Sequence, residues 1–397
     1  VVDVSVAATP TLGGTLVDAS ALHGACGVAH DDTRRLAFVA AGDASSLAVV
    51  DTTNPAAPSL AGVVVDGAAL DGAVGVCYDA ASQRVLVASE RGDSLSVVDV
   101  STPASPAVLG SVSDASSLNG ATGVACDAAS QRAFVASAAG DSLTVVDVSN
   151  PSQPSIVGTV SDAVSLAGAS AVSYDAATQR AFVASANGDS LAVVDVSDPA
   201  QPTLIGTFTD ANNLDGAAGV HYDAPTRRAI TVSKYAHSLA VVCVPNELLN
   251  GAVCGADLAL VGSRPDGTNL QGARAVTYDA PTQHAFVASA DADSLAVVDV
   301  SDPTGPLVAG VATNALLDGA CGVAYDAARQ LAIVASGGAD SLSVVDVSVA
   351  ATPTLGGTLV DASALDGACG VAHDDSRQLA FVAAGDASSL AVVDTTN

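Results

Sequence analysis

The residues of this sequence best suited to chemistry are aspartates that recur at regular positions. In each repeat one of them closes an apolar, strand-like segment: Asp31, Asp79, Asp127, Asp175, Asp223, Asp279, Asp326 and Asp374. A carboxylate at the end of a strand can accept backbone N–H bonds within the following turn, so we expect these residues to fix the turns. A ring of carboxylates that holds a cation is the alternative.

Two further aspartate sets lie between later segments of each repeat. The second set is Asp43, Asp93, Asp141, Asp189, Asp293, Asp340 and Asp386, and the third is Asp18, Asp66, Asp114, Asp162, Asp210 and Asp266. Calcium prefers clustered oxygens, but it needs about six to eight of them converging on one point. No EF-hand loop is present, so we expect no cofactor. Calcium remains the alternative, with these candidate ligands: Asp93, Asp141, Asp189, Asp293 and Asp340.

Two cysteines accompany the one long insertion in the array. Cys243 replaces the aspartate that ends the same segment in other repeats, and Cys254 lies within the insertion of eight residues. We expect a Cys243–Cys254 disulfide, since closing a loop of roughly ten residues contributes about 2–3 kcal/mol and disulfides persist in oxidising compartments. Two unrelated free thiols are the alternative.

The remaining cysteines carry no metal-binding spacing. We interpret all five as small buried fillers of the repeat: Cys26, Cys77, Cys126, Cys321 and Cys369. No Cys-x-x-Cys pair or Cys/His spacing indicates zinc.

The histidines do not assemble a catalytic set by spacing, and we expect no enzyme. His30 and His373 occupy a position held by tyrosine in most repeats, and no phosphate loop, nucleophile elbow or dinucleotide fingerprint occurs. One irregular repeat concentrates unusual residues, and irregularity in a near-perfect array indicates a partner contact. We expect the partner epitope there, at His221, Lys234, Tyr235, His237, Asn246 and Glu247.

A recurring Ser-Leu-x-Val-Val-Asp segment defines the elements that position these residues. Its final residue falls at 51, 99, 147, 195, 243, 299, 346 and 394, so most steps are 48 residues long. One unit contains four strand-like runs, at 171–174, 180–184, 190–196 and 203–208, separated by turn-forming residues. Four short strands per period are typical of a propeller blade. We therefore predict an all-β fold, one β-propeller domain over residues 1–397, built of four-stranded blades.

The two ends of the chain are nearly identical. Residues 1–54 and 344–397 differ at only three positions, His23/Asp366, Thr33/Ser376 and Arg35/Gln378. Combining the terminal strands into one blade closes a ring of eight, which we favour. Because the offset of 343 residues spans seven units, a seven-bladed ring with a duplicated overlap is the alternative.

The repeat resembles the LVIVD repeat of cell-surface proteins. The residues that carry the resemblance run from Leu191 to Pro199 as Leu-Ala-Val-Val-Asp-Val-Ser-Asp-Pro, followed by Pro202 and Gly206. Every unit contains a version, although the second position is Ala, Ser or Thr, and the Asp-Pro step is lost in the terminal copies. The resemblance implies a β-propeller on an extracellular or cell-surface protein, and it implies no reaction and no catalytic residues.

Composition narrows the class of partner. The net charge of −29, from 42 acids against 13 bases, repels phosphate backbones, so we expect no nucleic acid. No apolar run is long enough to span a membrane. The chain begins at Val1 and lacks methionine, so we expect it to be part of a longer polypeptide.

These observations favour a non-enzymatic extracellular module. We expect it to serve structure, adhesion or protein interaction at a cell surface, by binding protein partners or by self-assembly into a layer or filament. The alternative is a calcium- or carbohydrate-binding propeller that uses its acidic loop face.

Overall fold

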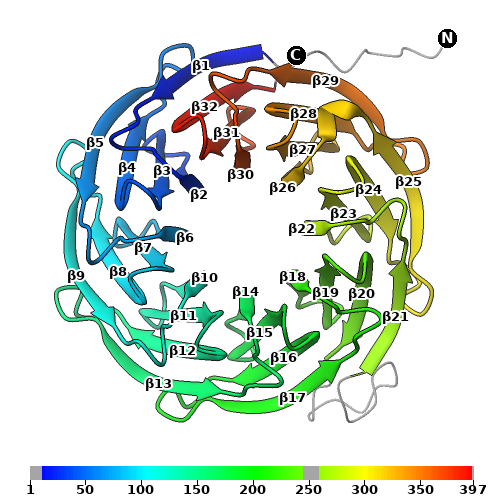
Figure 1. Cartoon of the computed structure of the whole chain (residues 1–397), viewed down its shortest axis with the longest axis horizontal. Coiled ribbons are helices and arrows are strands. Elements are labelled where there is room, and N and C mark those ends of the chain that lie inside the picture. The colour runs from blue at the N-terminus through cyan, green and yellow to red at the C-terminus, as the bar shows by residue number, and fades with distance from the viewer. Residues whose placement is uncertain (1–10, 245–258, 396–397) are drawn as a thin grey trace.

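The computed structural model describes residues 11–244 and 259–395, and these form a ring of eight four-stranded antiparallel sheets around a central axis (Figure 1). The inner strands are β2 (Ala25–Asp31), β6 (Ala73–Asp79), β10 (Ala121–Asp127), β14 (Ala169–Asp175), β18 (Ala217–Asp223), β22 (Ala273–Asp279), β26 (Ala320–Asp326) and β30 (Ala368–Asp374). The second strands are β3 (Leu36–Ala41), β7 (Arg84–Ser89), β11 (Arg132–Ser137), β15 (Arg180–Ser185), β19 (Arg228–Ser233), β23 (His284–Ser289), β27 (Leu331–Ser336) and β31 (Leu379–Ala384).

The third and outer strands complete each blade. The third strands are β4 (Ser46–Asp51), β8 (Ser94–Asp99), β12 (Ser142–Asp147), β16 (Ser190–Asp195), β20 (Ser238–Cys243), β24 (Ser294–Asp299), β28 (Ser341–Asp346) and β32 (Ser389–Asp394). The outer strands are β5 (Ser59–Val65), β9 (Ala107–Ser113), β13 (Ser155–Ser161), β17 (Thr203–Thr209), β21 (Ala259–Pro265), β25 (Leu307–Thr313), β29 (Thr354–Val360) and β1 (Thr11–Val17). Blades 1 to 7 run from β2 to β29 in chain order, and a single 3-10 turn, η1 (Ala315–Leu317), interrupts the described all-β chain.

Strand β1 closes the ring by completing blade 8. It lies antiparallel to β32, with Thr15 opposite Ala391, so the eighth sheet has the order β1-β32-β31-β30. The prediction of eight blades closed by the terminal strands is therefore confirmed, and the seven-bladed alternative is wrong.

The hydrophobic core lies between neighbouring blades. The second and third strands are buried on both faces, because each sheet is covered by the sheet before and the sheet after it. At the first junction Phe38 and Val49 of blade 1 pack against Leu70, Val85 and Val98 of blade 2. Small apolar side chains are well suited to this arrangement, since β-branched residues pack closely on a pleated surface.

An aromatic contact recurs at most junctions. A phenylalanine of the second strand packs on the tyrosine of the next inner strand, as in Phe134–Tyr174, with ring centroids 4.1 Å apart, and Phe182–Tyr222, 3.9 Å apart. The tyrosine of the repeat therefore contributes to the packing between neighbouring blades.

Two faces of the ring carry the loops. The Gly-Asp face comprises the loops that follow the second and fourth strands, which contact each other: the Asp114 amide donates to the Asp93 carbonyl at 3.1 Å. The Asp-Pro face comprises the turns after the inner strands and the connections after the third strands, where the Val100 amide donates to the Gln83 carbonyl at 3.1 Å. No helix among the described residues is long and apolar enough to cross a membrane.

Candidate functional site: two acidic loop faces

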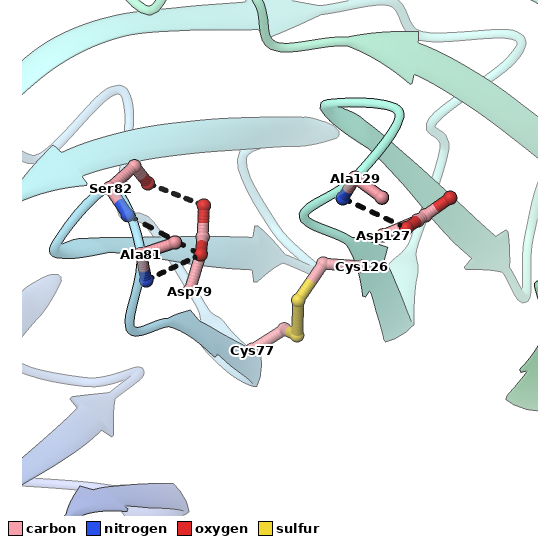
Figure 2. Close-up of a disulfide and its surroundings, with 7 residues drawn as sticks. All are labelled: Cys77, Asp79, Ala81, Ser82, Cys126, Asp127 and Ala129. Atoms are coloured by element: carbon pink, nitrogen blue, oxygen red, sulfur yellow. Dashed lines mark hydrogen bonds between the residues drawn. A yellow bond between two sulfur atoms is a disulfide. The ribbon is translucent and has the colours of Figure 1, made fainter.

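The aspartates that end the inner strands organise the turns of the Asp-Pro face, as expected. Asp79 accepts the Ala81 amide at 2.9 Å and the Ser82 hydroxyl at 2.5 Å, and Asp127 accepts the Ala129 amide at 3.0 Å (Figure 2). The same carboxylates also reach the next blade, which the sequence analysis did not predict. The hydroxyl of Tyr78 in blade 2 donates to Asp31 in blade 1 at 2.5 Å.

Hydrogen bonding sets the ionisation of this pair. Burial alone would raise the pKa of Asp31, but hydrogen bonds from Tyr78 and Arg34 lower it to about 2. Burial and the hydrogen bond to Asp31 raise the pKa of Tyr78 to about 12. The contact therefore holds an ionised carboxylate against a neutral phenol, which is the favourable combination.

Arginines in these turns tie non-adjacent segments together. Arg34 pairs with Asp31 at 2.7 Å and donates to the Val100 carbonyl, and Arg377 pairs with Asp374 and donates to the Thr52 carbonyl at 3.1 Å. These guanidinium groups serve the packing of the ring, so they are not available to bind an anionic ligand.

The candidate cation ligands on the Gly-Asp face have a backbone role. Asp93, Asp141 and Asp189 have left-handed φ angles between 45° and 48°, a conformation that aspartate tolerates better than most residues. Each carboxylate accepts an amide of the next blade, from Gly120 at 2.9 Å in the case of Asp93 and from Gly168 at 2.9 Å in the case of Asp141. Asp293 and Asp340 share the left-handed conformation. Calcium binding by these five residues stays a prediction.

Two members of the second aspartate set occupy a different position. Ser45 and Ser388 hold the left-handed position in blades 1 and 8, whereas Asp43 and Asp386 lie two residues earlier. Asp43 instead pairs with Arg91 of the next blade at 3.0 Å.

Close carboxylates make parts of the Gly-Asp face strongly acidic. Burial raises the pKa of Asp293, and the neighbouring Asp318 carboxylate raises it further. Burial and Asp366 act in the same way on the pKa of Asp340. A cationic partner bound beside these neighbouring carboxylates would reduce their repulsion.

Few basic side chains offset this charge. Among the described residues, the basic ones on the Gly-Asp face are Arg91, Lys234, Arg264 and Arg274. Arg91 is already paired with Asp43 and Asp71, and Arg264 lies 3.5 Å from Asp266.

The interpretation of four cysteines as fillers is wrong. Cys77 and Cys126 form a disulfide between the inner strands of blades 2 and 3, with their Cα atoms 6.2 Å apart (Figure 2), and Cys321 and Cys369 form another between blades 7 and 8, at 5.3 Å. Both separations lie in the range that a disulfide spans. Residues about one repeat apart are distant in sequence but lie on neighbouring blades of the ring. The spacing of these cysteines, 49 and 48 residues, could therefore have predicted their pairing.

Cys26 is the free thiol among the described cysteines, and it is exposed rather than a buried filler. Packing around its sulfur nevertheless raises the pKa of the thiol, and the Glu90 carboxylate raises it further. Cys243 is buried at the end of β20, while Cys254 lies outside the described residues, so the Cys243–Cys254 disulfide stays a prediction.

The predicted partner epitope divides between two places. Lys234 and Tyr235 extend from the β19–β20 hairpin, with the ammonium 4.9 Å from the ring centroid and Tyr235 59% exposed. On the same hairpin, the His237 Nδ1 accepts the Gly272 amide at 3.2 Å, replacing the aspartate of other blades. His221 lies within inner strand β18, beside Tyr278, where burial lowers its pKa. Asn246 and Glu247 lie outside the described residues. The epitope stays a prediction.

One cluster brings three potential metal ligands together on the Asp-Pro face. Ligand atoms of Asp326, His373 and Asp375 lie within 4.8 Å of one another. Asp326 is already paired with Arg329 at 2.7 Å, and the two ring nitrogens of His373 contact Asp375 at 2.8 Å and Thr395 at 3.2 Å. His373 thus replaces the tyrosine of other blades within a completed hydrogen-bond network.

The described residues form an eight-bladed β-propeller with two acidic loop faces. The model of the LVIVD repeat matches five segments of the chain: residues 36–66, 87–114, 132–162, 181–210 and 283–313. Each matched segment covers the second to fourth strands of one blade, namely blades 1, 2, 3, 4 and 6. No curated protein matches the chain.

Solved propellers share the architecture at low identity. Sqt1 of Saccharomyces cerevisiae is 9% identical with a TM-score of 0.74, covering 97% of this chain and 98% of its own. Sqt1 of Chaetomium thermophilum, solved bound to the N-terminus of ribosomal protein L10, is 14% identical with a TM-score of 0.70, covering 94% and 97%. A putative 6-phosphogluconolactonase of Bacteroides uniformis is 17% identical with a TM-score of 0.55, covering 71% and 84%. These identities establish a common fold alone.

Proposed function

We propose that this propeller is a non-enzymatic extracellular protein-interaction module whose Gly-Asp face binds a basic segment of a partner. The carboxylates on that face carry the proposal, since Asp318 and Asp366 raise the pKa of their neighbours and have no basic side chain among their described contacts. Complementary charge speeds encounter and selects partners with the opposite sign. Structure or adhesion at a cell surface is the role in which such a module would act.

The uniform blades and the inter-blade disulfides support this proposal. Catalysis needs different side chains converging on one point, whereas here the same residues recur around the ring to bind neighbouring blades. Disulfides persist mainly in oxidising compartments, which supports a position outside the cell. The Chaetomium thermophilum Sqt1 structure, bound to the N-terminus of ribosomal protein L10, provides an analogue of similar fold that holds a polypeptide terminus.

A binding assay with a ten-residue lysine peptide tests the charge complementarity. The full chain should bind this peptide, and binding should weaken steeply as salt rises, because exposed charges are screened. The double variant Asp318→Asn/Asp366→Asn should weaken binding by roughly twofold to thirtyfold, given that each exposed pair contributes about 0.2–1 kcal/mol. Asparagine occurs naturally at the same repeat position, as Asn119, so the variant should fold.

A matched variant on the opposite face controls for net charge. Asp198→Asn/Asp302→Asn removes the same charge from the Asp-Pro face, where Asn150 occupies the equivalent position. This variant should bind the lysine peptide as the unmodified chain does. Equal weakening by both double variants, or binding that does not respond to salt, would contradict the proposal.

Calcium binding on the Gly-Asp face is a second candidate, favoured by the same paired carboxylates. Calcium at millimolar concentration should then raise the melting temperature more than magnesium does, since calcium accepts irregular oxygen cages. The Asp318→Asn/Asp366→Asn variant should lose that difference. Identical melting curves in both ions would exclude this candidate.

A further inference from the structure

The junction between blades 7 and 8 differs from most others at the Asp-Pro face. In blade 8, His373 occupies the position that tyrosine holds in five other blades, and Asp375 follows where six blades have alanine. Such a tyrosine can donate its hydroxyl to Oδ2 of the aspartate that ends the preceding inner strand, as Tyr78 does to Asp31. Blade 8 has no hydroxyl at this position, so Asp326 at the end of β26 lies beside an imidazole instead.

The Asp326 carboxylate keeps room for one further ligand. Its side chain is only 2% exposed. Oδ1 accepts the Ala328 amide at 3.0 Å and the Arg329 amide at 3.1 Å, whereas Oδ2 accepts Nε of Arg329 at 2.7 Å. Since a carboxylate oxygen has two lone pairs, Oδ2 retains one among the described contacts. Burial raises the pKa of Asp326, but the hydrogen bonds from Arg329 lower it overall, so the carboxylate is ionised.

Hydrogen bonding determines which nitrogen of His373 carries a proton. The side chain is 2% exposed, and its Nε2 lies 3.2 Å from the hydroxyl oxygen of Thr395. That hydroxyl donates its proton to the Gln378 carbonyl at 2.8 Å and accepts Nη2 of Arg329 at 2.9 Å. Towards His373 the hydroxyl can therefore only accept, so Nε2 is the protonated nitrogen. A neutral ring then presents a lone pair at Nδ1.

The Nδ1 lone pair faces two carboxylates. It lies 2.8 Å from Oδ1 of Asp375, and one ligand atom from each of Asp326, His373 and Asp375 lies within 4.8 Å of the other two. Both nitrogens of His373 thus have neighbours, but these acceptors need a proton or a cation between them. A proton on Nδ1 would serve Asp375 and leave Oδ2 of Asp326 one donor short. A metal ion would serve all three groups.

We propose that Asp326, His373 and Asp375 form a zinc site that joins blades 7 and 8. Imidazole is a good ligand for zinc, whereas calcium and magnesium prefer oxygen ligands. The ligand atoms of a tetrahedral zinc ion lie about 3.4 Å apart, so small side-chain rotations suffice. The Cys321–Cys369 disulfide already links β26 and β30 at their beginnings, and zinc links the same two strands at their ends.

The surroundings supply what such a site needs. Metal-bound side chains are held by outer hydrogen-bond partners, which Arg329 provides for Asp326 and Thr395 for Nε2 of His373. Asp375 is 66% exposed, so the ion can enter from the Asp-Pro face. Water completes the tetrahedron, as is usual where the protein supplies three ligands.

Calorimetric titration of the full, disulfide-bonded chain with zinc chloride tests this inference. Magnesium in excess occupies sites made of carboxylates alone. One zinc ion should bind tightly per chain and raise the melting temperature, because it binds the folded state. Asp375→Ala and His373→Tyr introduce residues that other blades carry at these positions, so both variants should fold. Each should weaken zinc binding about a hundredfold or more, since losing an outer partner alone costs roughly ten- to a hundredfold.

Asp32→Ala is the matched control in blade 1. There His30 lies 2.9 Å from Asp32 at the equivalent positions, but within the described part of the chain this pair belongs to no group of three converging ligands. The control variant should therefore bind zinc as the unmodified chain does. Equal weakening by Asp32→Ala and Asp375→Ala, or unchanged binding by His373→Tyr, would overturn the proposal. Absence of tight zinc binding to the unmodified chain would also overturn it, in favour of a proton on Nδ1.

Discussion

Asp31 illustrates how a single side chain holds two blades of this propeller together. Its carboxylate accepts the Arg34 amide within its own turn and the Tyr78 hydroxyl of the next blade. Two other junctions show a similar contact, with Tyr174 at Asp127 and Tyr325 at Asp279, each 3.5 Å away. Residues that appear to be turn formers therefore also determine how blades dock.

Replacing Tyr78→Phe should destabilise the fold by about 1.5–3 kcal/mol near neutral pH, the range for a hydrogen bond to a charged group. Because the pKa of Asp31 is lowered to about 2, its stabilisation is present above about pH 4 and is lost as pH falls towards 2. Because the pKa of Tyr78 is raised to about 12, its stabilisation is present below about pH 10 and is lost as pH rises towards 12. Urea unfolding followed by circular dichroism should show this plateau.

Tyr222→Phe is the control for that prediction. The Tyr222 ring stacks on Phe182, and the described contacts include no hydrogen bond from its hydroxyl to Asp175. Its loss should be smaller and should not depend on acid pH. A pH-independent loss for Tyr78→Phe would show that the Asp31 contact does not contribute.

At this scale the sequence predicted the turn role of Asp79 and its equivalents, because that role depends on residues two or three positions away. It could not predict the bond from Tyr78 to Asp31, since 47 residues separate the partners and only the closed ring brings them together. The Cys77–Cys126 disulfide was not predicted for the same reason, because 49 residues separate the two cysteines.

The elements show a second recurring contact, between an outer strand and the next Pro-x-x-Pro connection. A Cβ added at Gly158 on β13 would lie 2.5 Å from the Pro199 carbonyl oxygen and 2.6 Å from Cδ of Pro202. Gly62, Gly110, Gly262 and Gly310 meet the corresponding connections. The repeat thus needs glycine at this position, because the outer strand and the proline-containing connection of the next blade lie too close together for a side chain.

Gly158→Ala should therefore lower the free energy of unfolding by about 1–3 kcal/mol, the usual cost of overpacking. Gly67→Ala is the matched control, because a Cβ at Gly67 would meet no atom within 4 Å. Chemical unfolding of both variants checks the prediction. Equal stabilities would mean that the connection moves aside at no cost.

Three cysteines occupy one position on three adjacent inner strands, Cys321 on β26, Cys369 on β30 and Cys26 on β2. A Cβ on Gly322 would clash with the Cys369 carbonyl oxygen, and a Cβ on Gly370 would clash in the same way with that of Cys26. The backbones of β26 and β30 therefore approach each other as closely as those of β30 and β2 do. Cys369 is thus placed alike relative to Cys321, to which it is bonded, and to Cys26.

We expect Cys321→Ser to form a Cys26–Cys369 disulfide under oxidising conditions. Peptide mapping by mass spectrometry without reduction would detect it. Cys26→Ser should retain the Cys321–Cys369 bond, and it serves as the control for normal folding. Two free thiols at positions 26 and 369 in oxidised Cys321→Ser would contradict the prediction.

The strand boundaries were largely predictable, because period-two patterning and turn residues are local signals. The predicted run 203–208 corresponds to β17, for example, and 180–184 to β15. Cysteine pairing was not predictable by the same reasoning, since it depends on which strands face each other across a junction.

For the whole molecule, closure depends on β1, whose partner β32 would otherwise be an unpaired edge. Deleting residues 1–17 should expose the backbone groups of β32 and favour association with other chains. Hydrogen exchange should become faster in β32 than in β16, which remains covered by β17. Unchanged protection of β32 would show that blade 8 is stable with three strands.

The sequence left seven and eight blades open for a physical reason. β1 and β29 have the identical sequence Thr-Leu-Gly-Gly-Thr-Leu-Val, so either copy fits as the outer strand of a blade. The choice depends on whether β29 completes blade 7 while β1 completes blade 8, as the structure shows. Local sequence preference cannot distinguish two identical strands.

The ring closes where β1 pairs with β32, and this pairing is a binding equilibrium between two segments of one chain. The strand is in effect a ligand attached to its own receptor, so its local concentration is set by the circumference of the protein and is on the order of millimolar for short flexible tethers. A free peptide of residues 11–17, or the same strand offered by another copy, competes only when its concentration approaches that value. Dilute chains therefore close on themselves, while crowding them at a surface would shift the same hydrogen bonds from within one molecule to between molecules.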